Sequence, residues 1–475
     1  MKCAEMRLRR QAVLATLSNM QFRVTIRSIL FAIMLCCFPL WPSYAKAQNL
    51  SRMDAVVQDY ANRNQFMGVA LVARDGKQLW CSAVGYADLE WQVPMSMDAK
   101  FEIASMTKQF TAASVFLLQD RGKLNVDDPV KKYMPDAPAA WDKITIYNLL
   151  THTSGIPSNS FDGITSWTQH KSPSELVDSF RNKPLEFEPG EKSKYSNAGY
   201  YLLGYLIEKI SSKQYSDFVR ENIFAPLAMN DSGYVSDYDV IAHRASGYHV
   251  YKLGVIQRAG YTEPSLMFSA GGLYSTAQDL VRWEQGLYGG KLLSAAALQR
   301  MTTAFRDVYA AGLAVKTIDG HHAFEHSGEM DGFTSDMIYY QDDKLVVIVL
   351  NNLSGESRSI AAKLGAVAHE EEVTLPSERR EIALPTDILG QYVGKYQNLA
   401  PGLDLVITLE DGRLMSQVVG SNGYQEPKHA LLPESDGAFF QKEFESEYTF
   451  VRDAKGAVSG VVFVSNGQMM KAAKQ

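Results

Sequence analysis

Two β-hairpins that lie far apart along the chain constrain its fold more than any other feature of the sequence. The first is predicted at 67–85, where an apolar run turns at Asp75-Gly76, and the second at 336–350, with its turn at 341–343. The chain between them is mostly helical in pattern, with Gly- and Pro-rich loops, and a further helix is predicted at 51–64. Strands at both ends with helices between them indicate an α+β domain, in which helices cover one antiparallel sheet. We place this domain at 50–365.

The C-terminal part of the sequence has a different pattern. A polar stretch punctuated by proline predicts a linker at 366–387. Short apolar β-type runs follow, separated by turn pairs such as Asp411-Gly412 and Lys455-Gly456. This pattern is typical of a small all-β barrel or sandwich, and we assign a β-barrel to 388–475.

The first 47 residues have the order of an export signal. Arg23 and Arg27 precede an apolar run at 29–38, and Ala45-Lys46-Ala47 supplies a small-residue cleavage site. We therefore expect cleavage near Ala47 and an exported protein, periplasmic or extracellular. Met20 is an alternative start. The rival interpretation is a membrane anchor through the same run, which is short for a bilayer span, so no membrane span is expected in the mature chain.

Charge and cysteine content restrict the partners and the chemistry. The formal net charge is -6, and the leader carries seven basic residues against one acidic, so its removal makes the chain more acidic. Nucleic acid is therefore excluded as a partner. Of the four cysteines only Cys81 follows residue 47, so the exported chain is expected to have no internal disulfide.

Ser105-Met106-Thr107-Lys108 forms an S-x-x-K motif at the predicted start of a helix that ends near Gly122. The spacing puts Ser105 and Lys108 on one helix face, one turn apart. Free N–H groups at a helix N-terminus can stabilise developing negative charge, and a desolvated lysine can take the proton of a serine hydroxyl. Taken alone, such a motif is more often an N-cap serine with a surface lysine, and Ser43-Tyr44-Ala45-Lys46 also fits it.

Two later motifs offer the other groups that a nucleophilic serine needs. Tyr195-Ser196-Asn197 supplies a phenol that can pass a proton to the leaving group and an amide that can bind a substrate carbonyl. His326-Ser327-Gly328 is the only H-x-G in the sequence. It leads into the second hairpin, where the N–H of Glu329 could join the N–H of Ser105 in an oxyanion hole.

With these motifs in this order, the sequence resembles the β-lactamase-related serine hydrolases, which include class C β-lactamases, DD-peptidases, D-aminopeptidases and related esterases. The resemblance covers about 50–365, and the C-terminal segment resembles the lipocalin-like module that often follows such domains. Five segments carry it in order: 101–111 around Ser105, 122–130, 144–157, 187–197 and 326–328.

The resemblance implies the serine β-lactamase and DD-peptidase fold, acylation of a serine, and a role for each motif residue. By this resemblance, Ser105 is the nucleophile, and Lys108 and Tyr195 form the proton-transfer pair. The substrate-binding residues are Asn197, His326, Gly328 and Glu329. Two positions depart from the family pattern: Ala104 replaces a usual glycine, and the third motif is His-Ser-Gly where true β-lactamases have Lys-Thr-Gly. Because that lysine helps to hold the substrate carboxylate, we expect ester or D-amino-acid peptide and amide substrates.

No cofactor and no metal is expected, because no H-E-x-x-H or Cys/His cluster supports a metal at His321-His322. His152, within a Thr/Ser/Gly turn, is expected to bond backbone groups. The expected partners are a small-molecule or peptide substrate and, through the C-terminal barrel, cell-wall fragments or lipid.

The sequence is compatible with two alternative functions. One is a β-lactamase or a penicillin-binding DD-peptidase. The other is a non-catalytic binding or scaffold protein, since a fold does not imply a function. The joint presence of Ser105, Lys108, Tyr195 and Asn197 argues against it.

Overall fold

The computed structural model describes residues 40–157, 167–251, 255–400, 402–442, 445–465 and 468–475. The predicted leader lies outside these residues except for 40–47, which belong to helix α2 (Leu40–Asn62). Helix α2 includes most of the helix that the sequence predicts at 51–64. Within the described ranges, no helix combines the length and apolarity needed to cross a membrane.

A six-stranded antiparallel sheet in the order β10-β11-β12-β13-β1-β2 organises the first large domain. The two predicted hairpins meet inside this sheet, because β1 pairs with β13 from Gly68 opposite Asn351 to Arg74 opposite Leu345. These two paired strands are buried along nearly their whole length. The strands are β1 (Gly68–Arg74), β2 (Lys77–Val84), β10 (Ala314–Ile318), β11 (His321–Met330), β12 (Phe333–Tyr340) and β13 (Leu345–Asn351).

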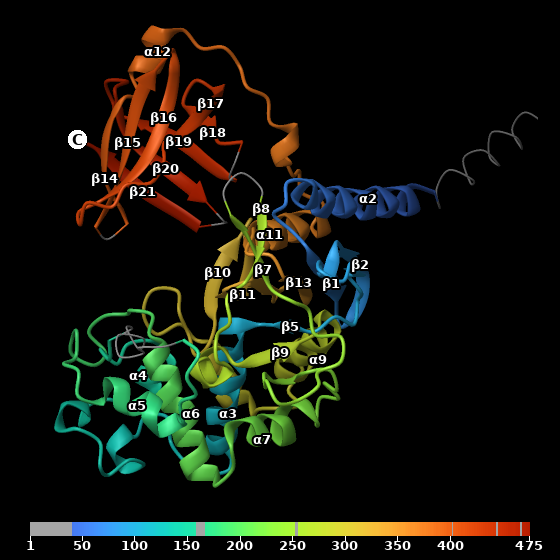
Figure 1. Ribbon diagram of the computed structural model, residues 1–475, viewed down its shortest axis with the longest axis vertical. Coiled ribbons are helices and arrows are strands. Elements are labelled where there is room, and N and C mark those ends of the chain that lie inside the picture. Colours follow the sequence, from blue (N-terminus) through green and yellow to red (C-terminus); the bar gives the residue numbers. More distant parts are fainter. Residues whose placement is uncertain (1–39, 158–166, 252–254, 401, 443–444, 466–467) are drawn as a thin grey trace, which may run out of the picture. The chain divides into compact units, whose positions relative to one another are not determined.

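Helices cover this sheet, which confirms the predicted α+β class (Figure 1). Helices α9 and α11 pack against the central strands, and α3, α6 and α8 pack against one another. The helices are α3 (Thr107–Asp120), α4 (Ile146–Leu150), α5 (Pro173–Arg181), α6 (Asn197–Ser211), α7 (Tyr215–Val219), α8 (Phe268–Gly271), α9 (Ala277–Tyr288), α10 (Ala295–Thr302) and α11 (Ser357–Ala368).

Short elements complete this domain. The strands are β3 (Tyr86–Asp88), β4 (Val93–Pro94), β5 (Phe101–Glu102), β6 (Gly233–Tyr234), β7 (Tyr248–Tyr251), β8 (Val255–Arg258) and β9 (Leu273–Ser275). The single-turn helices are η1 (Ala104–Met106), η2 (Val130–Lys132), η3 (Ala139–Trp141), η4 (Arg220–Phe224) and η5 (Pro264–Leu266).

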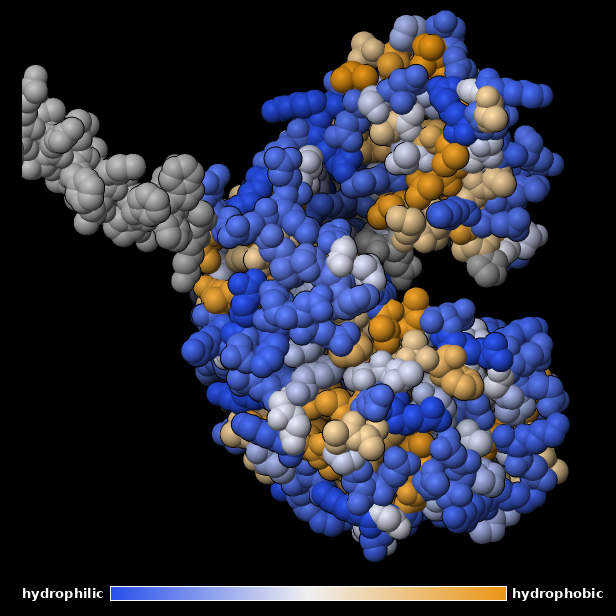
Figure 2. All heavy atoms as spheres, turned by 180° about the vertical axis from the view of Figure 1, so that it is seen from behind, coloured by the Kyte–Doolittle hydropathy of each residue, from blue (hydrophilic) through white to orange (hydrophobic). Residues whose placement is uncertain are grey.

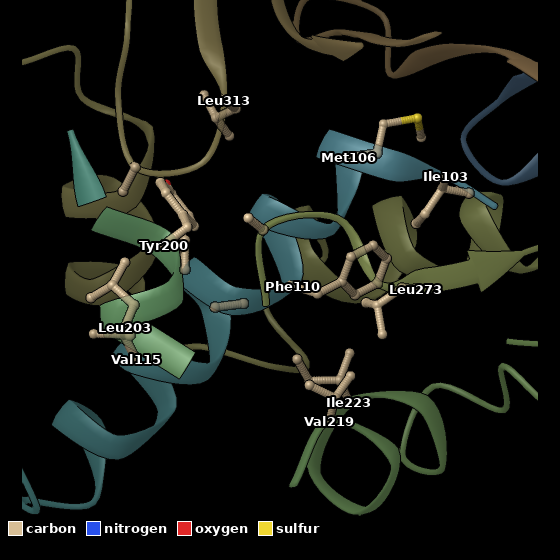
Figure 3. Packing of buried hydrophobic residues seen from close by; sticks show 14 of the residues in the cluster. Ile103, Met106, Phe110, Val115, Tyr200, Leu203, Val219, Ile223, Leu273 and Leu313 are labelled. Atoms are coloured by element: carbon tan, nitrogen blue, oxygen red, sulfur yellow. The ribbon is translucent and has the colours of Figure 1, made fainter. Parts of the chain in front are cut away.

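Helix α3 runs through the middle of the hydrophobic core. Every residue from Thr107 to Leu118 is buried, so the helix has no solvent-facing side over this length. Figure 3 shows Phe110 and Val115 of α3 among buried side chains from α6, β9 and the α7 region. A polar residue in the first turn of α3 is therefore surrounded by protein.

The chain continues through η6 (Pro376–Glu378) and α12 (Thr386–Gly390) into a closed eight-stranded barrel, which confirms the predicted β-barrel (Figure 1). Aromatic side chains fill much of its interior, including Tyr392, Phe439 and Phe450. The strands are β14 (Gly394–Ala400), β15 (Leu403–Glu410), β16 (Arg413–Gly420), β17 (His429–Ser435), β18 (Ala438–Phe440), β19 (Ser446–Arg452), β20 (Val458–Ser465) and β21 (Gln468–Lys474). On the face shown in Figure 2, hydrophilic residues cover most of the surface and hydrophobic residues form separate patches.

Candidate active site

Ser105 lies in the single turn η1, directly before helix α3 begins at Thr107. The first N–H groups of a helix have no acceptor within it, so this position can offer N–H groups to a ligand. Ala104, immediately before the serine, has a φ of +45°, which is in the left-handed region. This backbone explains why glycine suits that position, because side chains other than glycine are disfavoured there.

Lys108 is completely buried one turn further along α3. Its Nζ lies 3.0 Å from Ser105 Oγ and donates to the Ala270 carbonyl at 2.8 Å. Burial without a carboxylate partner lowers the pKa of Lys108 well below its ordinary value. Burial therefore favours the uncharged amine, which is the form that a base needs in order to accept a proton.

Tyr195 approaches the same pair from the loop that precedes α6. The Lys108 Nζ lies 4.9 Å from the centre of its ring, and its hydroxyl is hydrogen bonded to Ser105. Although 41% of the side chain is exposed, the hydroxyl end is enclosed, and burial raises the pKa of Tyr195 above its ordinary value. Tyr195 is therefore a neutral phenol that can pass a proton to or from Ser105.

Asn197 begins helix α6, and its side chain has an unused acceptor. Its Oδ1 is buried and has no hydrogen-bond partner among the described residues. Buried polar atoms are normally paired, so an unpaired one beside a cavity is a candidate ligand contact.

The third motif lies on β11, and Gly328 lets that strand approach the serine. A Cβ at this position would lie 2.1 Å from the carbonyl oxygen of Ile103, two residues before Ser105. Glycine is therefore required for the contact between β11 and the serine turn. Glu329, the next residue, lines the cavities beside Ser105.

His326 is held as a neutral imidazole in one tautomer. Its Nδ1 lies 2.7 Å from the Ser327 carbonyl, which only accepts, so this nitrogen carries the proton. Burial and the nearby Lys108 lower the pKa of His326 to about 4. The other nitrogen, Nε2, therefore accepts from the Tyr309 hydroxyl at 2.9 Å. The ring is uncharged at neutral pH, unlike the lysine of a Lys-Thr-Gly motif.

His152 is structural, as the sequence suggests. Its Nδ1 accepts from the Ser196 N–H at 3.1 Å, and its carbonyl accepts from the Lys194 N–H at 2.9 Å. Its ring lies 4.3 Å from the ring of Tyr195, measured between centres. His152 thus fixes the loop that carries Tyr195 and Asn197.

Two cavities meet at the serine, and Ser105, Asn197 and Glu329 line both. The first, of about 480 Å³, is largely apolar with two carboxylates at its wall. The second, of about 620 Å³, is more polar. The remaining residues of the first include Trp167, Tyr201, Met267, Met330 and Asp331, and those of the second include Tyr195, Tyr309, Lys316, His326 and Arg358.

The structure thus brings together all seven residues that the sequence selects. Sequence reasoning misses Tyr309 and Arg358, which line the second cavity. Neither belongs to a motif. Tyr309 lies in a loop before β10 and Arg358 in α11, so only the folded chain places them here. Among the described residues, no group of three or more His, Cys, Asp or Glu side chains could hold a metal ion.

Comparison with known proteins agrees with this geometry. The β-lactamase family profile matches residues 53–370, and a domain of unknown function, DUF3471, matches 378–473. A penicillin-binding protein of Bacillus subtilis (strain 168) is 28% identical over 450 residues, which cover 88% of this chain and 97% of the relative.

Two solved structures extend the comparison. A penicillin-binding protein from Bacillus halodurans is 27% identical with a TM-score of 0.60, covering 66% of this chain and 99% of its own. A D-amino acid amidase from Ochrobactrum anthropi SV3 is 26% identical with a TM-score of 0.57, covering 67% of this chain and 98% of its own. The chain therefore belongs to the β-lactamase family and is a serine hydrolase.

Proposed function

We propose that this protein is an exported serine hydrolase that forms an acyl-enzyme at Ser105 and acts on esters or on D-amino-acid amides and peptides. The observation that carries the proposal is the 3.0 Å contact between Ser105 Oγ and the completely buried Lys108 Nζ. A serine hydroxyl becomes nucleophilic when an adjacent base removes its proton.

In the proposed reaction, the groups around Ser105 act one after another. Lys108 accepts the hydroxyl proton as Ser105 Oγ attacks the substrate carbonyl. The N–H groups of Ser105 and Glu329 stabilise the oxyanion, and the Asn197 amide orients the substrate. Tyr195, which is hydrogen bonded to Ser105, donates its hydroxyl proton to the leaving group and takes up the proton held by Lys108, so that both groups regain their initial state. Water then attacks the acyl-enzyme, and the same groups act in reverse.

The first cavity supports a D-amino-acyl substrate. Trp167, Tyr201 and Met267 offer an apolar surface, whereas Glu329 and Asp331 offer carboxylates for an ammonium group. An amino acid with an apolar side chain and a free amine matches both features. Relatives include the D-amino acid amidase above and a D-stereospecific amidohydrolase from Streptomyces sp. that is 25% identical.

A β-lactam or DD-peptide substrate is the second candidate, favoured by the penicillin-binding relatives. The uncharged His326 weakens this candidate, because it cannot replace the cation that a β-lactam carboxylate meets in Lys-Thr-Gly enzymes.

The experiment is a substrate panel with the 48–475 chain and its Ser105→Ala variant. The panel holds p-nitrophenyl acetate and butyrate, D- and L-phenylalanine amide, N-acetyl-D-phenylalanine amide and nitrocefin. We expect Ser105-dependent hydrolysis of the esters and of the D-amide with a free amine. Equal rates for the free and N-acetylated D-amides would contradict the ammonium assignment. Absence of fluorophosphonate labelling at Ser105 would favour a non-catalytic binding protein.

Two further parts of the proposal have separate tests. N-terminal sequencing of the secreted chain should begin at Gln48 if the leader is cleaved after Ala47. Deletion of 388–475 should leave ester hydrolysis intact and lower activity on cell-wall material if the barrel binds such fragments.

A further inference from the structure

The strand beside Ser105 loses its outer neighbour at one residue. Strand β10 pairs with β11 from Ile318 opposite His321 to Ala314 opposite Glu325. The following residues of β11, His326 to Met330, continue to pair with β12 alone among the described strands. This uncovered edge carries the third motif. On this side, contacts other than strand pairing must therefore restrain it.

Four ionisable side chains from four different elements meet where β10 ends. Lys316 Nζ lies 2.5 Å from Glu325 Oε2, and Arg358 Nε lies 3.6 Å from Glu325 Oε1. Glu325 is 5% exposed, so its carboxylate is shared between two cations in a largely dehydrated setting. The four residues, here called the edge cluster, are Lys316 of β10, Glu325 of β11, Asp336 of β12 and Arg358 of α11.

Arg358 connects the edge cluster to the uncovered strand. Its Nη2 donates to Ser327 Oγ, the side chain at the centre of the third motif. Ser327 in turn lies opposite Asp336 in the β11–β12 ladder. Through this contact a helix on the sheet surface restrains the segment that faces Ser105.

Asp336 completes the edge cluster as a neutral group. Its carboxyl is hydrogen bonded to Glu325, and its Oδ1 is buried with no hydrogen-bond partner in the described part of the chain. Burial and the adjacent Glu325 raise the pKa of Asp336 well above its ordinary value. Burial opposes ionisation of Glu325 too, but Lys316 and Arg358 nevertheless hold its pKa below the ordinary value. The two carboxyls therefore share one proton, which Asp336 keeps and donates.

We propose that the edge cluster is a positioning device for the acyl transfer. Asp336 donates to Glu325, Glu325 holds Arg358, and Arg358 holds Ser327, so that the uncovered edge of β11 keeps its place beside Ser105. The inference rests on the proposed function. Asp336 and Glu325 are positioning residues in it, because they act through Arg358 and not on the reacting atoms.

The test compares two substitutions at Asp336 in the 48–475 chain with ester substrate. Asp336→Asn keeps a neutral donor to Glu325, and we expect kcat within about twofold of wild type. Asp336→Ala removes the donor, and we expect kcat to fall at least about tenfold with little change in KM, because a small displacement at a reacting centre is costly. Equal effects of the two substitutions, or a change confined to KM, would overturn the proposal.

The matched control is Glu284→Gln. Glu284 is also a buried carboxyl without a partner at Oε2 among the described residues, but it lines a cavity that does not include Ser105. We expect its kcat and KM to match wild type. A tenfold loss in this control would show that any buried acid matters, and the specific proposal would be wrong.

A double-mutant comparison covers the case in which Asp336→Ala does not fold. Ser327→Ala and Arg358→Gln are made singly and together. If the contact between them carries the effect, the double variant loses no more kcat than the worse single variant. Additive losses would contradict the proposal. Failure of the proposed function itself is recognised separately, because wild type would then show no Ser105-dependent turnover.

Discussion

The interior around Ser105 and the interior of the C-terminal barrel are both buried, yet they contain different kinds of side chain. The first holds three buried ionisable side chains, Lys108, His326 and Asp336. The second is filled by aromatic rings such as Phe439 and Phe450. A buried ionisable group costs stability, so a concentration of such groups points to a function that needs them.

The polar groups inside the barrel reinforce the contrast, because they pair with one another. The Gln441 amide donates to Ser416 Oγ at 2.7 Å, and the Tyr396 hydroxyl donates to the Tyr392 carbonyl at 2.7 Å. Around Ser105, by contrast, Asn197 Oδ1 and Asp336 Oδ1 have no partner among the described residues. The difference predicts that substitutions inside the barrel mainly change stability, whereas substitutions around Ser105 mainly change activity. Each prediction below tests one side of that difference.

The largest effect is expected for Ser105→Ala. Loss of the nucleophile should lower kcat by a factor on the order of 10⁴ or more, with an unchanged melting temperature. The measurement is steady-state ester hydrolysis together with calorimetry. Ser114→Ala is the control, because Ser114 is a buried serine on the same helix whose hydroxyl donates only to the Phe110 carbonyl. Residual activity within tenfold of wild type would mean that another residue is acylated.

Lys108→Met should lower kcat/KM almost as far, since the residues of one catalytic unit act together. In wild type, kcat/KM should rise with pH as Lys108 loses its proton. Because burial lowers the pKa of Lys108, the midpoint of this rise should lie at a pH well below the ordinary lysine pKa of about 10.4. The check is a pH–rate profile from pH 5 to 10. A rise that begins only above pH 9 would show that Lys108 is not the base.

Phe439→Ala tests the barrel side of the comparison. Phe439 is 1% exposed and lies 4.9 Å from the Tyr392 ring between centres, so truncation leaves a cavity. We expect the barrel to lose about 3–5 kcal/mol of unfolding free energy. Ester kcat should stay at the wild-type value under conditions where the barrel remains folded. Loss of kcat with a folded barrel would show that the two interiors are functionally coupled.

Glu284 is an exception to this comparison, because it is a buried carboxyl of the first large domain that lies outside the site. The Glu284→Gln variant tests its effect on stability. Burial raises the pKa of Glu284 well above its ordinary value, so the unfolded chain loses a proton that the folded chain keeps. Wild-type stability should therefore fall as pH rises above about 4.3, and the glutamine should abolish that loss. We expect the variant to melt a few degrees higher at pH 7 and no higher at pH 3.5. Calorimetry of both proteins at both pH values measures these melting temperatures.

The smallest effect is expected for Ala104→Gly. The left-handed backbone costs a non-glycine residue about 1–2 kcal/mol, while glycine adds about 0.5–1 kcal/mol of unfolded-state entropy. The variant should gain between zero and about 1.5 kcal/mol of stability and keep wild-type kcat. A marked rise in kcat would instead show that strain at Ala104 limits the position of Ser105.

Local patterns in the sequence are sufficient to predict the hairpins and the barrel, and they locate the S-x-x-K, Y-x-N and H-x-G motifs, whose roles are assigned by their resemblance to a known family. Each depends on short-range physics: strand alternation, turn-forming pairs and one helical turn between Ser105 and Lys108. The sequence likewise shows that the third motif is His-Ser-Gly and lacks the lysine of Lys-Thr-Gly.

The tertiary structure alone decides which other side chains complete the site. Tyr309 reaches His326 from a loop, and Arg358 reaches Ser327 from helix α11. The fold also decides the protonation of these groups, because burial lowers the pKa of Lys108, and burial together with the adjacent Glu325 raises the pKa of Asp336. Sequence periodicity reports which face of an element is apolar. Long-range contacts and desolvation depend on how the elements pack, and no local pattern contains that information.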